Sequence, residues 1–308
     1  MKKILVIGGS GFVSGAVAAA AYRRGHDVWV LTRGERPVPE GVVPITADRH
    51  DTPRVEHLIH EQGVYWDAVI DCIGFVEADA RQDAEVFGPY TDHLIFVSTD
   101  FVYRPGHRSY PQAEFAETYN DQGYGASKRR CEKVLIEADT APVTIFRPCH
   151  IYGPGSKLGC LPAHGRDARL IERIIAREPL RLVGGGWFLQ QPIYVGDLAR
   201  VLVEAAGTES TFGRLANVAG PDIVPSRRYY EYIGAALDRE VVISEIPVDE
   251  YLSAHPESVN FLDHRVYNRA AVEDMRLPLP STPLADGLAR QVRYLRSDQS
   301  VHHWDALA

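Results

Sequence analysis

The first half of the chain alternates short apolar segments with longer amphipathic ones. Residues 3–7 form a β-branched apolar run of the kind found in a central parallel strand, and glycines at 8–11 connect it to an alanine-rich helix expected over 12–24. This alternation predicts an α/β fold, a doubly wound parallel sheet of the Rossmann type. Further strands are expected at 28–32, 68–72, 94–98 and 143–147, and further helices at 55–62, 77–87 and 124–138.

The pattern changes near residue 150. Proline and glycine become frequent, and helices expected at 167–177 and 227–237 lie between short strands. Residues 191–217 return to a strand followed by a helix, which suggests that the two parts are interleaved along the chain. We therefore predict a dinucleotide-binding domain formed by 1–150 with 191–217, and a smaller C-terminal substrate-binding lobe formed by 151–190 and 218–308.

Composition narrows the class of protein. The 308 residues are 45% hydrophobic and 24% charged, as in soluble globular proteins, and the net charge of -8 disfavours a nucleic-acid partner. The apolar runs are shorter than the roughly 20 residues that cross a bilayer, so no membrane association is expected. The four cysteines lack the spacing of a zinc site or a disulfide framework. We expect a cytoplasmic protein with reduced thiols and no metal site.

The glycine-rich loop is the first candidate for chemistry. Gly8 and Gly11 permit a tight turn and a close approach of backbone N–H groups to a pyrophosphate, at the N-terminus of the helix that begins with Phe12 and Val13. Such a loop also occurs as a purely structural turn. Its place between a first strand and a helix favours dinucleotide binding.

The end of the second expected strand bears on which dinucleotide is bound. An acid that would grip a ribose 2′-hydroxyl is replaced there by Arg33, which can pair with a 2′-phosphate or remain a solvated charge. NADP(H) is therefore favoured, with NAD(H) possible. Asp48 can accept a hydrogen bond from the adenine amino group, or simply cap a turn.

The candidate acid/base set is Thr99, Tyr124 and Lys128. Tyr124 and Lys128 are four residues apart and share one helix face, so the ammonium can lower the pKa of the phenol and also hold the cofactor ribose. Thr99, at the end of a strand, would orient the same substrate oxygen. Taken alone, a tyrosine and a lysine at this spacing are a common surface pair. Together with the upstream loop they predict hydride transfer at a carbon that bears a hydroxyl or ketone.

An ordered series of motifs runs along the chain, in the loop at 8–15 and in residues 97–103, 124–128, 147–154 and 193–197. This series resembles the extended short-chain dehydrogenase/reductases, the NAD-dependent epimerase/dehydratase family. The resemblance implies a Ser/Thr-Tyr-Lys catalytic set, Pro148 beside the cofactor, a nucleotide-sugar or related sugar substrate, and a homodimer formed through a four-helix bundle. The bundle would use the helix at 77–87 and the helix that carries Tyr124.

The same resemblance narrows the reaction and marks substrate contacts. Residues 98–102 are similar to the corresponding segment of dTDP-4-dehydrorhamnose reductases, and Phe101 stands where sugar dehydratases carry an acid. Dehydration is therefore not expected, and epimerase and ketoreductase both stay open. Gln190 stands where family members place an arginine against the diphosphate, so Arg265 and Lys157 are the candidates for the missing cation. The expected substrate residues are Asp100, His150, Gln190 and Arg265.

Two other functions remain open. Related folds include chloroplast stem-loop RNA-binding proteins. The net negative charge of this chain argues against RNA binding. Others are sensors that bind NADP without turnover, and these tend to lack the tyrosine and lysine pair that is present here.

Overall fold

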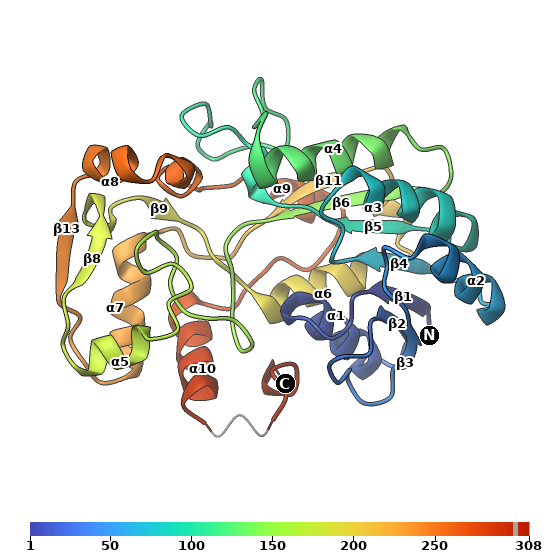
Figure 1. Ribbon diagram of the computed structural model, residues 1–308, viewed down its shortest axis with the longest axis horizontal. Helices are drawn as coiled ribbons and strands as arrows, with labels where there is room; N and C mark the ends of the chain where they lie inside the picture. Colours follow the sequence, from blue (N-terminus) through green and yellow to red (C-terminus); the bar gives the residue numbers. More distant parts are fainter. Residues whose placement is uncertain (298–300, 308) are drawn as a thin grey trace.

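The computed structural model describes residues 1–297 and 301–307 (Figure 1). Its centre is a seven-stranded parallel sheet with the order β11-β6-β5-β4-β1-β2-β3, which confirms the predicted fold class. The order reverses direction beside β1, and a ligand site is expected where such a reversal opens a crevice at the carboxyl ends of the strands. The strands are β1 (Lys3–Ile7), β2 (Asp27–Thr32), β3 (Val43–Thr46), β4 (Ala68–Asp71), β5 (Leu94–Val97), β6 (Val143–Pro148) and β11 (Leu215–Val218).

Helices cover both faces of this sheet. In β1, Ile4 and Val6 face a core that includes α1 (Phe12–Arg23) and α6 (Val195–Ala205). Leu5 and Ile7 face the opposite core, as the two-residue period of a strand requires. The helices over that second face are α2 (Thr52–Gln62), α3 (Glu77–Gln82) and α4 (Gly123–Glu137), and α3 continues as a π-helical turn over Asp83–Phe87.

Most of the remaining chain packs around a third core beside the carboxyl ends of the central strands, whereas Val272 of α9 (Ala270–Asp274) belongs to the core that includes α1 and α6. The small sheets of this part pair β7 with β10, β9 with β12 and β8 with β13. Because α6 and β11 lie with the main sheet (Figure 1), we retain the division into two interleaved parts as our interpretation. The elements are β7 (Ile151–Tyr152), α5 (Leu170–Ile175), β8 (Leu180–Val183), β9 (Leu189–Gln190), β10 (Ile193–Tyr194), β12 (Val224–Pro225), α7 (Ser226–Ala236), β13 (Ile243–Ile246), α8 (Val248–Ala254), α9 (Ala270–Asp274) and α10 (Leu284–Arg296).

In the part of the chain that the structure describes, no helix has the length and apolar character needed to span a membrane.

Candidate active site

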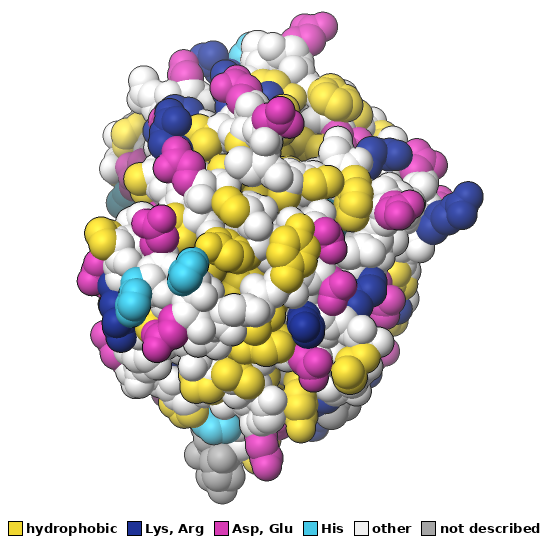
Figure 2. Space-filling view, turned by 90° about the vertical axis from the view of Figure 1, so that its right-hand side faces the viewer, with side chains coloured by type: hydrophobic (Ala, Val, Ile, Leu, Met, Phe, Trp, Pro, Cys, Tyr) yellow, Lys and Arg dark blue, Asp and Glu magenta, His cyan; other side chains and the backbone are white. Residues whose placement is uncertain are grey.

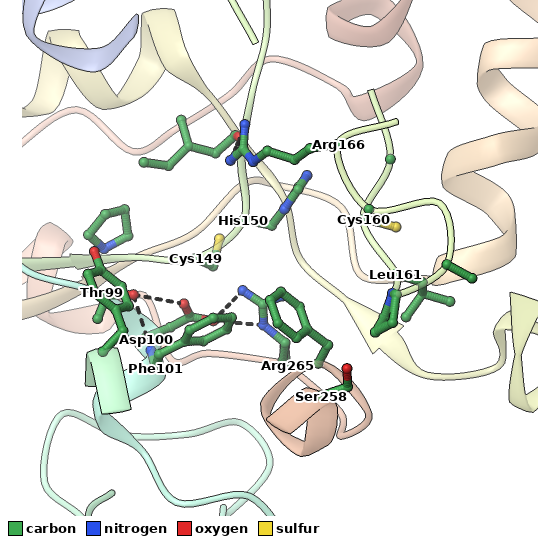
Figure 3. A pocket seen from close by; sticks show the side chains of 18 of the residues that line it. Thr99, Asp100, Phe101, Cys149, His150, Cys160, Leu161, Arg166, Ser258 and Arg265 are labelled. Carbon is green, nitrogen blue, oxygen red and sulfur yellow. Dashed lines mark hydrogen bonds and ion pairs between the residues drawn. The ribbon is translucent and has the colours of Figure 1, made fainter. Parts of the chain in front are cut away.

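A cavity of about 550 Å³ opens at the carboxyl ends of β5 and β6. Thr99, Asp100 and Phe101 enter it directly after β5, and His150 enters it after β6 (Figure 3). The opposite wall comes from segments that follow β7 in the sequence. It consists of residues 159–163, Gly165, Arg166, Tyr251, Ser258, Phe261 and Arg265.

Two hydroxyl groups of the expected catalytic set reach this cavity. Thr99 caps a short 3-10 turn by accepting a hydrogen bond from the backbone N–H of Phe101 at 3.2 Å. Tyr124 lies in the first turn of α4, lines the cavity and is 47% exposed. The ring of Phe101 lies edge-on to Tyr124 and to Phe261, with centroids 6.4 and 4.9 Å apart. Thr99 and Tyr124 are therefore brought together in an opening with an apolar border.

The protonation of Tyr124 differs from the expectation. Burial, followed by the negative charge of Asp100, raises the pKa of its phenol to about 12, and a hydrogen bond with Thr99 opposes this shift. Lys128 is not among these influences, so the predicted lowering of the phenol pKa by the ammonium is wrong for the chain as it stands. At neutral pH the hydroxyl is protonated and can donate.

Lys128 has another set of partners. Its Nζ donates to the carbonyl groups of Gly74 at 2.5 Å and Val97 at 2.6 Å, and it lies 3.9 Å from the centre of the Phe96 ring. Burial lowers its pKa, while the charge of Asp71 raises it. The ammonium thus links the loop that follows β4 to the end of β5, and Lys128 is 1% exposed and lines neither this cavity nor the pocket beside the glycine-rich loop.

A buried ion pair that sequence reasoning missed holds α4 in position. Glu132 of α4 accepts from Arg147 of β6 at 2.6 Å and from the Ser98 hydroxyl at 2.5 Å. Both charged side chains are fully buried, and the pKa of Glu132 is lowered because these hydrogen bonds and the Arg147 charge outweigh the opposing effect of burial. The only signal in the sequence was a charged residue within the apolar run at 143–147.

Asp100 is held by protein partners. Its Oδ2 accepts from Arg265 at 2.6 and 2.8 Å and from the Tyr267 hydroxyl at 2.5 Å. Arg265 is 2% exposed, and its Nη1 is buried with no hydrogen-bond partner among the described residues. Arg265 thus brings one free donor to the cavity wall, whereas the carboxylate of Asp100 serves to fix Arg265.

The other two residues that were expected to contact the substrate, His150 and Gln190, lie in different surroundings. The Nε2 of His150 is buried and, within residues 1–297 and 301–307, has no hydrogen-bond partner. Burial, with Arg166 and Arg265 nearby, holds its pKa well below the usual value, so the imidazole is neutral. Gln190 is 1% exposed in β9 and is not part of the cavity wall. Both polar atoms of its amide are buried without a hydrogen-bond partner among the described residues, and its role as a substrate contact stays a prediction.

A second pocket, of about 270 Å³, lies beside the glycine-rich loop. Gly8 has φ +117°, and a Cβ there would lie 2.8 Å from the Cβ of Ser14, so the turn requires glycine. The backbone N–H groups at the start of α1, at Phe12 and Val13, point away from the helix as donors for an anion. Gly8, Gly11, Arg33 and Asp48 all line this pocket, while Pro148 lines the neighbouring cavity. The shape and donors fit a dinucleotide.

Two residues at the far end of this pocket already have partners. The guanidinium of Arg33 is 58% exposed and pairs with Glu35 at 3.0 Å. Asp48 accepts from the backbone N–H of His50 at 3.0 Å, so it caps a turn. The other carboxylate oxygen of Asp48 is available to accept a hydrogen bond from adenine, and that contact stays a prediction.

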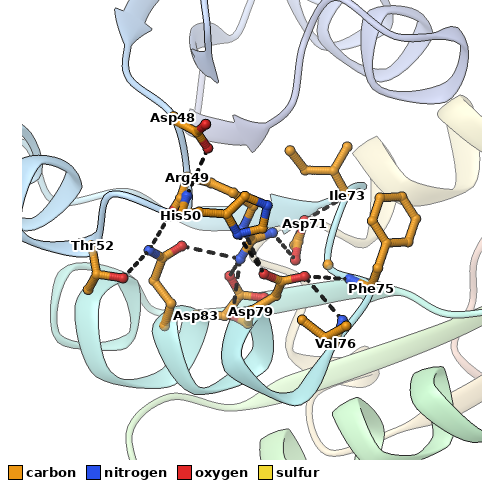
Figure 4. A network of polar contacts seen from close by, with 12 residues as sticks. Asp48, Arg49, His50, Thr52, Asp71, Ile73, Phe75, Val76, Asp79 and Asp83 are labelled. Atoms are coloured by element: carbon orange, nitrogen blue, oxygen red, sulfur yellow. Dashed lines mark hydrogen bonds and ion pairs between the residues drawn. The ribbon is translucent and has the colours of Figure 1, made fainter.

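A charged network between the pocket and α3 was not foreseen (Figure 4). Arg49 is buried and its guanidinium lies 3.0 Å from Asp71, 3.5 Å from Asp79 and 3.0 Å from Asp83. Burial and the charge of Asp71 raise the pKa of Asp83. Burial would also raise the pKa of Asp71, but Arg49 and a hydrogen bond with Asp83 lower it. The carboxyl groups of Asp71 and Asp83 thus interact with each other as well as with Arg49.

The network also fixes the loop after β4, to which Lys128 donates a hydrogen bond. Asp71 accepts from the N–H of Ile73 at 2.7 Å, and Asp79 accepts from the N–H of Phe75 at 2.7 Å. Gly74 lies between Ile73 and Phe75, and its carbonyl group accepts from Lys128. Among the described residues, no group of three or more His, Cys, Asp or Glu side chains is arranged to hold a metal ion.

The comparisons with known proteins agree with this geometry. The chloroplast stem-loop binding protein of 41 kDa b from Arabidopsis thaliana is 24% identical over 238 residues, which make up 72% of this chain and 60% of that protein. The 2′-dehydrokanamycin reductase of Streptomyces kanamyceticus is 26% identical over 272 residues, 84% of this chain and 73% of the relative.

Among solved structures, the UDP-glucuronic acid 4-epimerase from Bacillus cereus in complex with NAD has a TM-score of 0.75 at 18% identity, covering 96% of this chain and 98% of that one. The model of the NAD dependent epimerase/dehydratase family matches residues 4–219. Because this match covers most of the chain, the protein belongs to the NAD dependent epimerase/dehydratase family and is an enzyme of the NAD(P)-dependent oxidoreductase type.

Proposed function

We propose that the protein is a ketoreductase that acts on a ketone carbon of a sugar derivative, with Tyr124 as the proton donor. The observation that carries this proposal is the cavity in which the hydroxyl groups of Thr99 and Tyr124 meet, beside a pocket shaped for a dinucleotide. Epimerisation uses the same residues and is the second candidate. It begins with proton removal from a carbinol, which a phenol with a pKa of about 12 performs poorly at neutral pH.

Each residue of the set has a task that follows from its position. Thr99 donates to the substrate oxygen and orients it toward Tyr124, whose proton is transferred to that oxygen as the carbonyl group is reduced. Lys128, held by the carbonyl groups of Gly74 and Val97, has a third N–H with which to hold the cofactor ribose. A bound nicotinamide supplies the hydride.

The substrate class follows from the opposite wall of the cavity. His150 Nε2 and Arg265 Nη1 are buried polar atoms without hydrogen-bond partners among the described residues, and Figure 3 shows Arg166 beside His150. Phe101 and Phe261 add apolar surface. Such a wall suits the oxygen-rich rim and apolar face of a sugar ring. The name of the Streptomyces relative describes a reductase, and that of the solved epimerase describes a nucleotide sugar, so we propose a sugar ketone with or without a nucleotide.

The test is the state of the cofactor. The purified protein is to be examined by absorbance and mass spectrometry for a retained dinucleotide, then assayed for NADPH or NADH oxidation with a panel of keto sugars. A reductase releases its cofactor in each cycle and consumes added reduced dinucleotide. Tightly retained oxidised cofactor, with no net consumption, would contradict the reductase and support the epimerase.

We propose NADP(H) as the preferred dinucleotide, because Arg33 and Arg36 both line the pocket at the end of β2. We expect Arg33→Ala to weaken NADPH binding about tenfold, the size of one lost charge-assisted hydrogen bond, and to leave NADH binding nearly unchanged. Titration calorimetry with both dinucleotides measures this, and NADH serves as the internal control. Equal losses for the two would mean that Arg33 does not contact a 2′-phosphate.

RNA binding is less well supported. Figure 2 shows one face of the molecule, on which positive and negative side chains are interspersed, and the net charge is -8. An RNA-binding surface needs concentrated positive charge. The stem-loop binding named for the Arabidopsis relative is therefore not proposed for this chain.

We further propose a cytoplasmic homodimer that pairs α3 and α4 of each subunit. The outward side chains of α3, the π-helical turn after it and α4 include charges of both signs, at Arg81, Glu85, Arg130 and Lys133, together with the exposed Ile136. Glu77 and Arg130 already pair across the two helices at 2.9 Å. A bundle built here would therefore have a substantially polar interface.

A further inference from the structure

The segment of residues 301–307 packs against the glycine-rich loop, although the two lie at opposite ends of the sequence. The Nε2 of His303 donates to the carbonyl group of Gly11 at 3.2 Å. The ring of His303 also lies 6.4 Å from that of Phe12, centre to centre. Gly11 and Phe12 form the N-terminus of α1, which is expected to meet the cofactor pyrophosphate. Figure 1 shows this end of the chain beside α1.

Glycines elsewhere in the protein leave space for this segment. Trp304 is 3% exposed, and a Cβ on Gly15 would lie only 2.6 Å from its ring. A Cβ on Gly155, after β7, would lie 2.6 Å from the ring of His303. Side chains at either glycine would push the segment away. Two glycines from different parts of the fold thus leave the space that the rings of His303 and Trp304 occupy. This fit argues against a chance contact between the segment and α1.

Polar contacts fix the other side of the segment. Arg23, in the last turn of α1, donates to the carbonyl group of Trp304 at 2.8 Å and pairs with Asp305 at 2.9 Å. The segment therefore spans α1 from its N-terminus to its C-terminal end. Gly11, whose carbonyl group accepts from His303, lines the dinucleotide pocket, whereas none of residues 301–307 does. The segment thus lies along the border of the pocket without being part of its wall.

We propose that residues 301–307 are a positioning element of the dinucleotide site, which holds the glycine-rich loop in its pyrophosphate-binding conformation and slows release of the cofactor. The inference rests on the proposed cofactor site. Undocking of the segment would let the first turn of α1 fray, and the apparent dissociation constant rises as the binding-competent fraction falls. Trp304 and His303 act through the loop rather than by touching the reacting atoms.

The test compares matched variants of the full chain. We expect Trp304→Ala to raise the dissociation constant for NADPH about tenfold, if roughly a tenth of the loop stays competent, and to speed NADPH dissociation in stopped-flow chase experiments. Trp304→Phe should restore most of the affinity. The control is Trp187→Ala, which removes a 60% exposed tryptophan that does not line either pocket.

A second pair of variants covers the case in which Trp304→Ala fails to fold. Arg23→Ala removes the polar anchors, while Arg24→Ala removes only an exposed pair with Glu204. We expect faster NADPH release with the first alone. In the cofactor-free protein, hydrogen–deuterium exchange of the amides at 11–15 should rise with Arg23→Ala and stay unchanged with Arg24→Ala.

Different results separate the two claims. Unchanged NADPH release and unchanged exchange in both Trp304→Ala and Arg23→Ala would overturn the inference while leaving the proposed function intact. A wild-type protein that binds neither NADPH nor NADH would instead overturn the proposed function and, with it, the role of the segment.

Discussion

Tyr124→Phe is expected to lower turnover about 10³-fold, within the range that positioned acid–base groups contribute. The substitution removes one oxygen from a ring that Phe101 already borders edge-on, so the cavity keeps its shape. Cofactor affinity should stay nearly intact, because the proposed contacts to the dinucleotide come from the glycine-rich loop and Lys128. Steady-state rates with NADPH and a keto sugar, together with the NADPH dissociation constant, measure both effects.

Tyr22→Phe provides the control. Tyr22 is 45% exposed on α1, similar to Tyr124, but lies outside the cavity, so its loss should leave the rate unchanged. Because the donor is the protonated phenol, reduction should be independent of its ionisation at neutral pH and fall only as the pH approaches about 12. Retention of most of the rate by Tyr124→Phe would remove this residue from the chemistry.

Arg49→Met is expected to have the largest effect on stability. The substitution removes the guanidinium from among Asp71, Asp79 and Asp83, whose side chains are each 3% exposed. Breaking a buried ionic network on one side leaves uncompensated charge and costs about 3–5 kcal/mol. The free energy of unfolding, measured by urea denaturation, should fall by that amount, or the protein should fail to accumulate in folded form.

Arg81→Met is the matched control for Arg49→Met. Arg81 lies on the exposed side of α3, where loss of a charge costs about 1 kcal/mol or less. A similarly small loss for Arg49→Met would mean that the carboxylates protonate or rehydrate at little cost. In that case the loop between Asp71 and Asp79, which Lys128 grips, would not depend on Arg49.

The features that could be predicted from the sequence are those set within one element or between adjacent ones. The β1 strand, the turn at Gly8 and the start of α1 follow from local hydrophobic period and glycine placement, and the spacing of Tyr124 and Lys128 fixes their shared helix face. Strand β3 was missed because it is short, is mostly exposed and contains Pro44.

The features that could not be predicted depend on contacts between distant segments. Asp100 meets Arg265 across 165 residues, and Gly11 meets His303 across 292. The hydrophobic period of the sequence carries no information about contacts between such distant residues. The burial of Gln190 could not be predicted, because a two-residue strand gives no pattern from which to infer the direction of its side chains. The phenol pKa was misjudged because spacing along a helix does not reveal where the lysine ammonium is bound.

The most direct measurement is a crystal structure of the protein with NADPH. The account predicts the pyrophosphate at the start of α1, near Phe12 and Val13, and the nicotinamide ring beside Pro148 with its reactive carbon facing the hydroxyl groups of Thr99 and Tyr124. A nicotinamide ring bound elsewhere, or a Tyr124 hydroxyl turned to bulk solvent in that complex, would contradict it.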